Sequence, residues 1–127
     1  MKKLVVDTSI IIDFLRSKNK ADSLLYELAE EDLSISIITH TELYAGKSVW
    51  ENSEAKEALE KVLAGMSLIT LDKRISERAG HIKSYSNISL IDALIAATAL
   101  IDNIELVTLN IKDFEKVKGL KLFKHSG

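Results

Sequence analysis

Three acidic residues of this chain stand where apolar runs end and helical patterns begin. Asp7 follows the apolar run at residues 4–6, Glu42 comes shortly after a second apolar run, and Asp92 opens a long apolar helix pattern. In an open parallel sheet, ligands bind beyond the carboxyl ends of the strands, so we expect the three carboxylates to meet there. Converging carboxylates repel one another unless one is protonated or a cation lies between them. Hard oxygen ligands of this kind suit Mg²⁺ or Mn²⁺ together with a substrate phosphate.

Each acid also has a purely structural explanation. Asp7 is placed to cap a helix, Thr39 and Glu42 have the spacing of a capping box, and Ser89 and Asp92 have it loosely. Acids in a first helical turn complement the helix dipole, by about 0.3–1 kcal/mol each. Taken together, the acids favour a metal site, because all three follow apolar runs and Asp92 heads the most apolar helix, where a bare charge is costly.

The hydrophobic pattern predicts the elements that would position these acids. Residues 4–6 indicate a strand buried on both faces. The other predicted strands are 33–38, 66–71 and 105–108, with a last edge strand at 120–123. The predicted helices are 8–16, 21–29, 39–49, 55–66, 72–85 and 90–101, and a loop or short helix is expected at 109–118. Strands that alternate with helices predict an α/β fold, with helices on both faces of a mostly parallel sheet of four to five strands.

The composition restricts the class of protein. The chain has 127 residues, 46% of them hydrophobic and 28% charged, and residues 1–127 are expected to form a single domain. It has no cysteine, which excludes disulfides and thiolate metal sites and suits the cytoplasm. No segment approaches the roughly 20 apolar residues of a membrane span, and the first apolar run is too short for a signal peptide. A net charge of −2 argues against a strongly basic nucleic-acid binder. The same net charge is compatible with a local rim of basic residues.

Four short motifs occur in order along the chain and give it a specific resemblance. They are VDTS at 6–9, TELYAG at 41–46, DALIAATA at 92–99 and TLNIKDF at 108–114. With these motifs the chain resembles PIN-domain proteins, and most closely the VapC-type toxins of toxin–antitoxin pairs. The resemblance covers nearly the whole chain. It implies a PIN-like three-layer α/β/α sandwich and a metal-dependent ribonuclease with an acidic site.

The resemblance also assigns roles to residues. Asp7, Glu42 and Asp92 match the three core acids of the family. Asp7 and Asp92 would anchor Mg²⁺ or Mn²⁺, and Glu42 would complete the cluster or position the attacking water. The fourth family position, two residues past the threonine, is Asn110 in this chain, and Asp113 lies three residues further on. Either one is a candidate for the site. The reaction implied is an in-line attack that leaves 5′-phosphate and 3′-hydroxyl ends.

Three kinds of partner follow from the same resemblance. The substrate would be RNA, although the residues do not identify which RNA. Family antitoxins insert a C-terminal segment along a groove of the toxin, so a cognate VapB-type antitoxin is expected. Ile11, Phe14 and Leu15 either line that groove or belong to the core. Family members are often homodimers, and this chain is expected to form one. The basic residues that are candidates to frame the acidic site are Lys47, Lys73, Arg74 and Lys112.

Four other classes of protein share part of this sequence pattern. A catalytically inactive PIN fold that only binds RNA or protein is the main alternative, and Asn110 is the feature that favours it. A haloacid-dehalogenase-type phosphatase would carry an acid two residues past the first one, where this chain has Ser9. A response-regulator receiver would need paired acids before the end of the first strand, where this chain has Lys2, Lys3 and Leu4. A dinucleotide-binding fold would need a glycine-rich turn, which this sequence lacks. We expect His40, His81 and His125 to lie outside the site.

Overall fold

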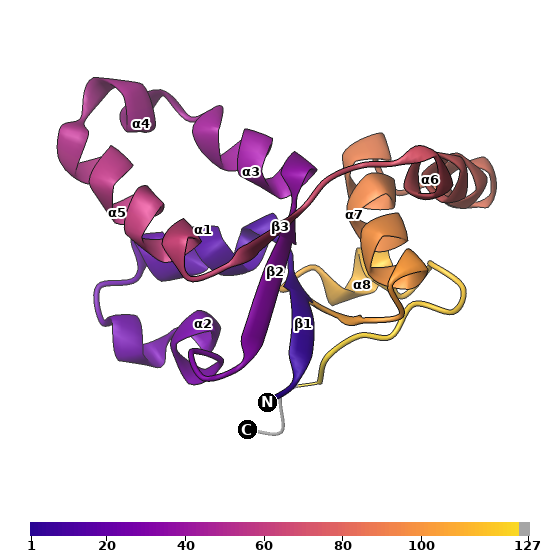
Figure 1. Cartoon of the computed structure of the whole chain (residues 1–127), viewed down its shortest axis with the longest axis horizontal. Helices are drawn as coiled ribbons and strands as arrows, with labels where there is room; N and C mark the ends of the chain where they lie inside the picture. Colours follow the sequence, from indigo (N-terminus) through magenta and orange to yellow (C-terminus); the bar gives the residue numbers. More distant parts are fainter. Residues whose placement is uncertain (125–127) are drawn as a thin grey trace.

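The sheet of this protein has four parallel strands, and the first strand of the chain lies in its interior (Figure 1). The computed structural model of the chain describes residues 1–124, so residues 125–127, with His125, lie outside it. The strand order is β3-β2-β1-β4. The strands are β1 (Lys3–Val6), β2 (Asp32–Ser36), β3 (Ser67–Ile69) and β4 (Glu105–Val107). The α/β fold and the burial of the first strand on both faces are confirmed, while the single domain over the whole chain stays a prediction.

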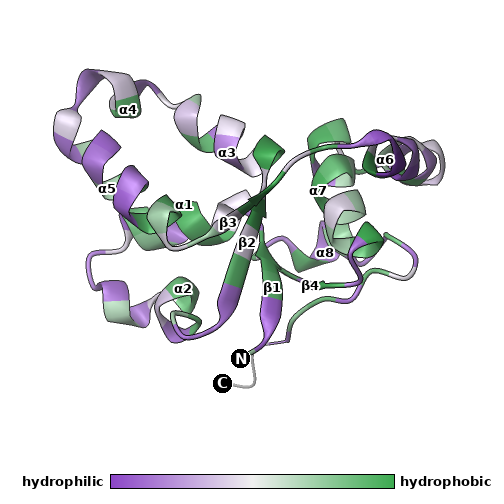
Figure 2. Ribbon diagram, in the orientation of Figure 1, coloured by the Kyte–Doolittle hydropathy of each residue, from purple (hydrophilic) through white to green (hydrophobic). Residues whose placement is uncertain are grey.

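The side chains of β1 build a hydrophobic core on each face of the sheet. Leu4 and Val6 belong to one cluster and Val5 to the other, because successive side chains of a strand point to opposite faces. All three are fully buried. In Figure 2 the hydrophobic colours gather on the strands and on the helices beside them, and the polar colours lie further out. An apolar run on both faces is therefore what a strand between two helical layers requires.

The first core cluster lies under the helices of the amino-terminal half (Figure 1, left). Its residues come from α1, α2, α3, α4 and α5 as well as from the sheet. Helix α1 has the bounds that the sequence predicted. The bounds of the five helices are Thr8–Arg16, Leu24–Glu27, Ile37–Tyr44, Lys47–Glu51 and Ser53–Ala64, respectively.

The second core cluster lies between the sheet and the helices of the carboxyl-terminal half (Figure 1, right). These helices are α6 (Lys73–Tyr85), α7 (Leu90–Ile101) and α8 (Ile111–Phe114). Helix α7 contacts both β4 and α6, which explains why it is apolar nearly all round. Three residues of α6 at helical spacing are buried against this cluster: Ile75, Ala79 and Ile82.

The second strand ends earlier than the sequence predicted. A strand was expected over 33–38, but β2 ends at Ser36 and α3 begins with the next residue. The Oγ atom of Ser36 accepts a hydrogen bond from the backbone N–H of Ile38 at 3.0 Å. Such N-cap bonds satisfy a donor that a helix start leaves unpaired. The predicted capping box that began at Thr39 is therefore wrong, since Thr39 lies inside the helix.

The predicted helix over 39–49 is divided into the end of α3 and the start of α4. The break falls at Gly46, which is the N-cap residue of α4. Trp50 stabilises the break, because its indole Nε1–H donates to the carbonyl of Tyr44 at 2.7 Å. This bond gives a partner to one of the carbonyls that the end of α3 leaves free.

Two further predictions were too long. The helix expected over 21–29 is a 3₁₀ turn, η1 (Lys20–Asp22), followed by α2, because Ser23 interrupts it and caps α2. The edge strand expected over 120–123 is reduced to an isolated parallel bridge between Leu106 and Leu122. Over residues 1–124, no helix is long and apolar enough to cross a membrane.

Candidate active site at the carboxyl edge of the sheet

Asp7 is the most buried acid at the carboxyl edge of the sheet, with 3% of its surface exposed. It directly follows β1 and occupies the N-cap position of α1, but its side chain makes no capping hydrogen bond. Instead, its Oδ2 atom accepts hydrogen bonds from the hydroxyls of Ser9 (2.8 Å) and Thr108 (2.7 Å). The capping explanation for Asp7 is therefore wrong. Neutral hydroxyls hold the carboxylate, so its negative charge is solvated but not neutralised.

Glu42 projects from α3 and is held by a buried pair of threonines. The Thr8 hydroxyl donates to Oε1 of Glu42 at 2.6 Å, and the Thr8 and Thr39 hydroxyl oxygens lie 3.1 Å apart. A hydroxyl has one proton to give. Since the Thr8 proton goes to the carboxylate, the Thr39 hydroxyl is left to donate to Thr8. This relay fixes one oxygen of Glu42 although the residue as a whole is exposed.

Asp92 lies in the first turn of α7 and is half-buried. Its backbone N–H donates to Oγ of Ser89 at 3.0 Å, so Ser89 is the N-cap residue as its spacing predicted. The Asp92 carboxylate also accepts a hydrogen bond from the Ser89 side chain, which favours its ionised form. Its position near a helix N-terminus partly compensates its charge through the helix dipole.

Both candidates for the fourth position lie in the segment after β4. The backbone N–H of Asn110 donates to Oγ1 of Thr108 at 2.9 Å, and Thr108 in turn holds Asp7. The Asn110 side chain is exposed and makes no capping bond to α8. Asp113 lies one turn further on, in α8, with its Oδ1 atom 3.9 Å from Nζ of Lys116. The negative charge of Asp113 raises the pKa of Asp92.

The pKa of Asp92 shows that the acids lie close enough to interact. Burial raises this pKa above the ordinary value of 3.8, since a desolvated carboxylate resists ionisation. The negative charge of Asp7 raises it further, and Glu42 and Asp113 add to the effect, while a hydrogen bond from Ser89 lowers it. The fold therefore brings Asp7, Glu42 and Asp113 within electrostatic range of Asp92.

The three predicted core acids of this group have no basic partner among the described residues. Over residues 1–124, no lysine, arginine or histidine forms an ion pair with Asp7, Glu42 or Asp92. Nor do any three acids or histidines of that range stand close enough together to hold a metal ion between them. Mg²⁺ fits both facts, because it binds through one or two carboxylates and keeps several waters. The excess negative charge and the hard oxygen atoms suit such a cation.

A groove reaches the acidic centre from the side of α1. Its volume is about 310 Å³, and it runs between α1 and the helices α3, α4 and α5. Glu42 lies in its wall, together with Arg16 and a series of apolar side chains that includes Leu15. Of the other two apolar candidates, Ile11 is fully buried in the core, and Phe14 lines a separate hollow beside Leu25.

Thr39 is the residue that the sequence interpretation placed wrongly. Its spacing from Glu42 indicated a helix cap, but it lies inside α3, is fully buried and supports Thr8. A signal was present in the sequence, since Thr39 follows two isoleucines and a buried hydroxyl needs a partner. The four basic candidates all lie on the surface. Two of them already have acidic partners, because Lys73 pairs with Glu77 and Arg74 pairs with Asp72.

The sequence matches known proteins along most of its length. Residues 4–120 match the family model of the PIN domain. The chain is 32% identical over 124 residues to Ribonuclease VapC10 of Mycobacterium tuberculosis, covering 93% of this chain and 90% of that protein. It is 35% identical over 127 residues to Ribonuclease VapC1 of Methanocaldococcus jannaschii, covering 95% and 87%.

Solved structures share the fold. The crystal structure of DNA-bound VapBC from Salmonella typhimurium contains a chain with a TM-score of 0.83, 22% identity, and coverage of 97% of this chain and 98% of that one. A toxin–antitoxin complex from Klebsiella pneumoniae gives a TM-score of 0.75 and 28% identity, covering 92% and 94%. At 22% identity, the likeness to the Salmonella chain shows the shared fold alone.

Proposed function

Because the chain belongs to the PIN-domain family, among the VapC ribonucleases, we propose that it is an endoribonuclease that requires Mg²⁺ or Mn²⁺. PIN ribonucleases are generally metal-dependent. The observation that carries the proposal is the group of acids around Asp92. Burial and neighbouring negative charges raise the pKa of Asp92, while no basic side chain of residues 1–124 pairs with Asp7, Glu42 or Asp92. The chemistry of that group suits a divalent cation and, through it, a phosphate.

In the proposed mechanism, Asp7 and Asp92 hold the cation, directly or through water. Asp7 keeps its orientation because the Ser9 and Thr108 hydroxyls both bind its Oδ2 atom. When bound, the cation lowers the pKa of a water and stabilises charge on the phosphoryl oxygens. Glu42, fixed through Oε1 by Thr8, orients the attacking water or a second cation with its other oxygen. The attack on phosphorus is in line and leaves 5′-phosphate and 3′-hydroxyl ends.

We assign the fourth acidic position to Asp113. Its charge contributes to the raised pKa of Asp92, and its carboxylate has only an exposed, long contact with Lys116. Asn110 contributes through its backbone, which orients Thr108. The main alternative, an inactive PIN fold that only binds RNA or protein, rested on Asn110, and an acid at Asp113 weakens that argument.

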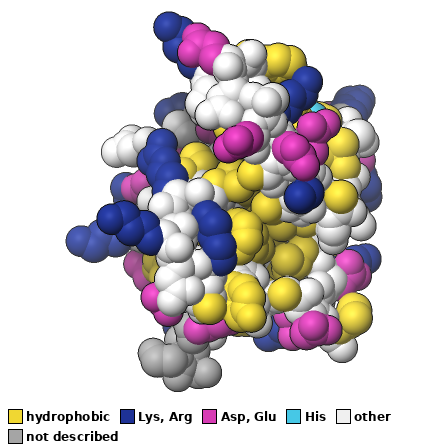
Figure 3. Space-filling view, turned by 90° about the vertical axis from the view of Figure 1, so that its left-hand side faces the viewer, with side chains coloured by type: hydrophobic (Ala, Val, Ile, Leu, Met, Phe, Trp, Pro, Cys, Tyr) yellow, Lys and Arg dark blue, Asp and Glu magenta, His cyan; other side chains and the backbone are white. Residues whose placement is uncertain are grey.

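We further propose that the chain is the toxin of a VapBC-type pair and acts in the cytoplasm, where its RNA would be found. Structural neighbours of the chain are VapBC complexes. The proposed antitoxin site is the groove between α1 and α3 to α5, because its wall joins apolar side chains to Glu42. Figure 3 shows the corresponding side of the molecule, where hydrophobic side chains gather in a hollow framed by charged ones. A homodimer is also proposed, and light scattering of the purified protein would test it.

The test is cleavage of a panel of single-stranded and structured RNAs by purified protein free of antitoxin. Reactions would contain Mg²⁺, Mn²⁺ or EDTA, and would be repeated with Asp7→Asn and Asp92→Asn. We expect cleavage that needs the metal and that both variants lose, with 5′-phosphate ends on the products. If the protein neither cleaves RNA nor gains thermal stability from either metal, the binding-module alternative is correct instead.

A further inference from the structure

Helix α6 concentrates positive charge in a chain whose net charge is −2. Its thirteen residues include four basic side chains and one acidic one, Glu77, so the helix carries a net charge of +3. The basic residues are Lys73, Arg74, Arg78 and Lys83. Figure 2 shows α6 at the outside of the molecule with its hydrophilic colours outward. A helix that is basic where the rest of the chain is acidic indicates a surface that meets an anion.

The charged and aromatic side chains of α6 are ordered along one stripe. Arg74, Arg78, His81 and Tyr85 follow one another at intervals of four, three and four residues, which places them on the same side of the helix. The neighbouring stripe of α6, formed by Ile75, Ala79 and Ile82, is buried in the core beside α7 and so fixes the orientation of α6. We call the first set, together with Lys118, the α6 stripe.

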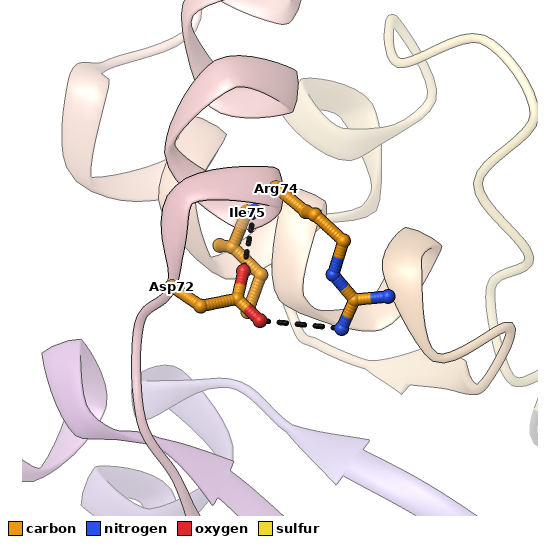
Figure 4. A network of polar contacts seen from close by, with 3 residues as sticks. All are labelled: Asp72, Arg74 and Ile75. Atoms are coloured by element: carbon orange, nitrogen blue, oxygen red, sulfur yellow. Dashed lines mark hydrogen bonds and ion pairs between the residues drawn. The ribbon is translucent and has the colours of Figure 1, made fainter.

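The middle of the α6 stripe is a shallow hollow of about 330 Å³ that Arg74, Arg78 and His81 line with Glu77 and Ile101. Over residues 1–124, Arg78 forms no ion pair. Arg74 contacts Asp72 at 3.2 Å, while Oδ1 of Asp72 accepts from the backbone N–H of Ile75 at 2.9 Å (Figure 4). Exposed ion pairs of this kind are weak, so the guanidinium of Arg74 remains available to a stronger anion.

Lys118 extends the stripe at its Tyr85 end. The backbone N–H of Lys118 donates to the Tyr85 hydroxyl at 3.0 Å, and its Nζ atom lies 5.0 Å from the centre of the Tyr85 ring. The ring of His81 meets the same tyrosine edge-on, with centroids 5.3 Å apart. Basic groups alternating with aromatic rings are what single-stranded nucleic acids bind, because phosphates need cations and bases need flat faces.

We propose that the α6 stripe binds the sugar–phosphate backbone of the RNA substrate outside the acidic centre. This inference rests on the proposed ribonuclease function. Without its cation the acidic centre repels a polyanion, so binding of RNA in that state depends on another surface. Two arginines supply it best, since the guanidinium fork matches a phosphate. Helix α6 also leads directly into α7 and packs along it, so RNA held on α6 is held on the same pair of helices as Asp92.

The test compares two double variants of the full chain. Arg74→Gln with Arg78→Gln removes two charges from the stripe, and Lys18→Gln with Lys61→Gln removes two exposed charges from the opposite layer. Binding of a fluorescein-labelled single-stranded RNA of mixed sequence would be followed by anisotropy in EDTA, which prevents cleavage, at several salt concentrations. Each phosphate contact contributes about 0.7 to the slope of log affinity against log salt. The stripe variant should therefore lower that slope by about 1.4, and the control should leave it unchanged.

Cleavage kinetics supply a second readout. The stripe variant should raise KM for the RNA about tenfold or more with kcat unchanged, because it removes binding that is equal in ground and transition states. If the unaltered chain cleaves RNA but the stripe variant matches it in slope and KM, the inference fails and the proposed function stands. If the unaltered chain neither binds nor cleaves RNA, both fail. If the variant loses binding of polyglutamate but not of RNA, the stripe binds an acidic protein and the inference is wrong.

Discussion

The hydroxyl of Thr108 donates a 2.7 Å hydrogen bond to Oδ2 of Asp7, and it joins residues that lie 101 positions apart in the chain. Both residues are almost fully buried. The bond ties the end of β1 to the end of β4, which are neighbours in the sheet. It therefore serves the fold and the acidic centre together, because the carboxylate it orients is the one nearest the core.

Replacing Thr108 with valine should cost both stability and activity. Valine keeps the shape but leaves a buried carboxylate with one hydroxyl donor fewer, for a loss of about 1–3 kcal/mol in the free energy of unfolding. Urea titration measures this loss, and RNA cleavage should fall with it. Thr108→Ser retains the hydroxyl and is the matched control. Equal unfolding midpoints for the valine variant and the unaltered chain would show that the bond is not formed.

Metal-free Asp92→Asn should be more stable than the unaltered chain at neutral pH. Burial, and then the charge of Asp7, raise the pKa of Asp92 above 3.8. The folded state therefore holds this proton more tightly than the unfolded state. The stability that the protonated form provides is fully present below pH 3.8 and is lost as pH rises through the folded-state pKa.

The measurement for Asp92→Asn is the melting temperature in EDTA across that pH range. Asparagine has no charge to desolvate, so its advantage should appear at neutral pH and vanish below pH 3.8. Adding Mg²⁺ should raise the melting temperature of the unaltered chain more than that of the variant. A variant that melts at the same temperature as the unaltered chain at every pH would mean that the other acids do not act on Asp92.

Thr8→Val should slow RNA cleavage by about 10- to 100-fold, which is the usual effect of losing a group that orients a metal-site ligand. The reason is the 2.6 Å hydrogen bond from Thr8 to Oε1 of Glu42. The effect should fall on kcat, measured at saturating RNA. Thr8→Ser keeps the donor and should retain most of the rate. A valine variant with full kcat would show that Thr8 does not position Glu42 for the reaction.

Asn52→Ala should lower stability without changing the chemistry. The Oδ1 atom of Asn52 accepts from the backbone N–H groups of Glu54 (2.9 Å) and Ala55 (3.3 Å) and so caps α5. Loss of such a cap costs about 1 kcal/mol. Differential scanning calorimetry should show the lower melting temperature, while kcat below the transition stays the same. Asn52→Ser, which can still cap, should melt close to the unaltered chain.

The sequence predicted the sheet and the helices that flank it, and it singled out Asp7, Glu42 and Asp92 as candidates, because each leaves a local signal. An apolar run of three residues, two of them β-branched, indicates β1, and a segment that is apolar apart from Asp92 and Thr98 indicates α7. The acid that follows a buried strand is visible for the same reason, as at Asp7. These features depend on neighbours in the chain, so pattern alone suffices to find them.

The features that were missed depend on contacts between distant segments. Thr39 looked like a helix cap, but Thr8, 31 positions away, makes it a buried support. The end of α3 at Tyr44 is stabilised by the indole of Trp50. The helix propensities of residues 39–49 do not predict this hydrogen bond. The last bridge at Leu122 was overestimated as a strand because apolar residues there pack against the core without continuing the ladder.

The central claim is that the acids around Asp92 bind a divalent cation, and titration with Mn²⁺ tests it most directly. Electron paramagnetic resonance of free Mn²⁺ would count the ions bound by the unaltered chain, Asp7→Asn, Asp92→Asn and Asp102→Asn. Asp102 ends the same helix and is the matched control. We predict that the first two variants lose the tightest site and that Asp102→Asn keeps it. Equal Mn²⁺ binding by all four proteins would contradict the claim.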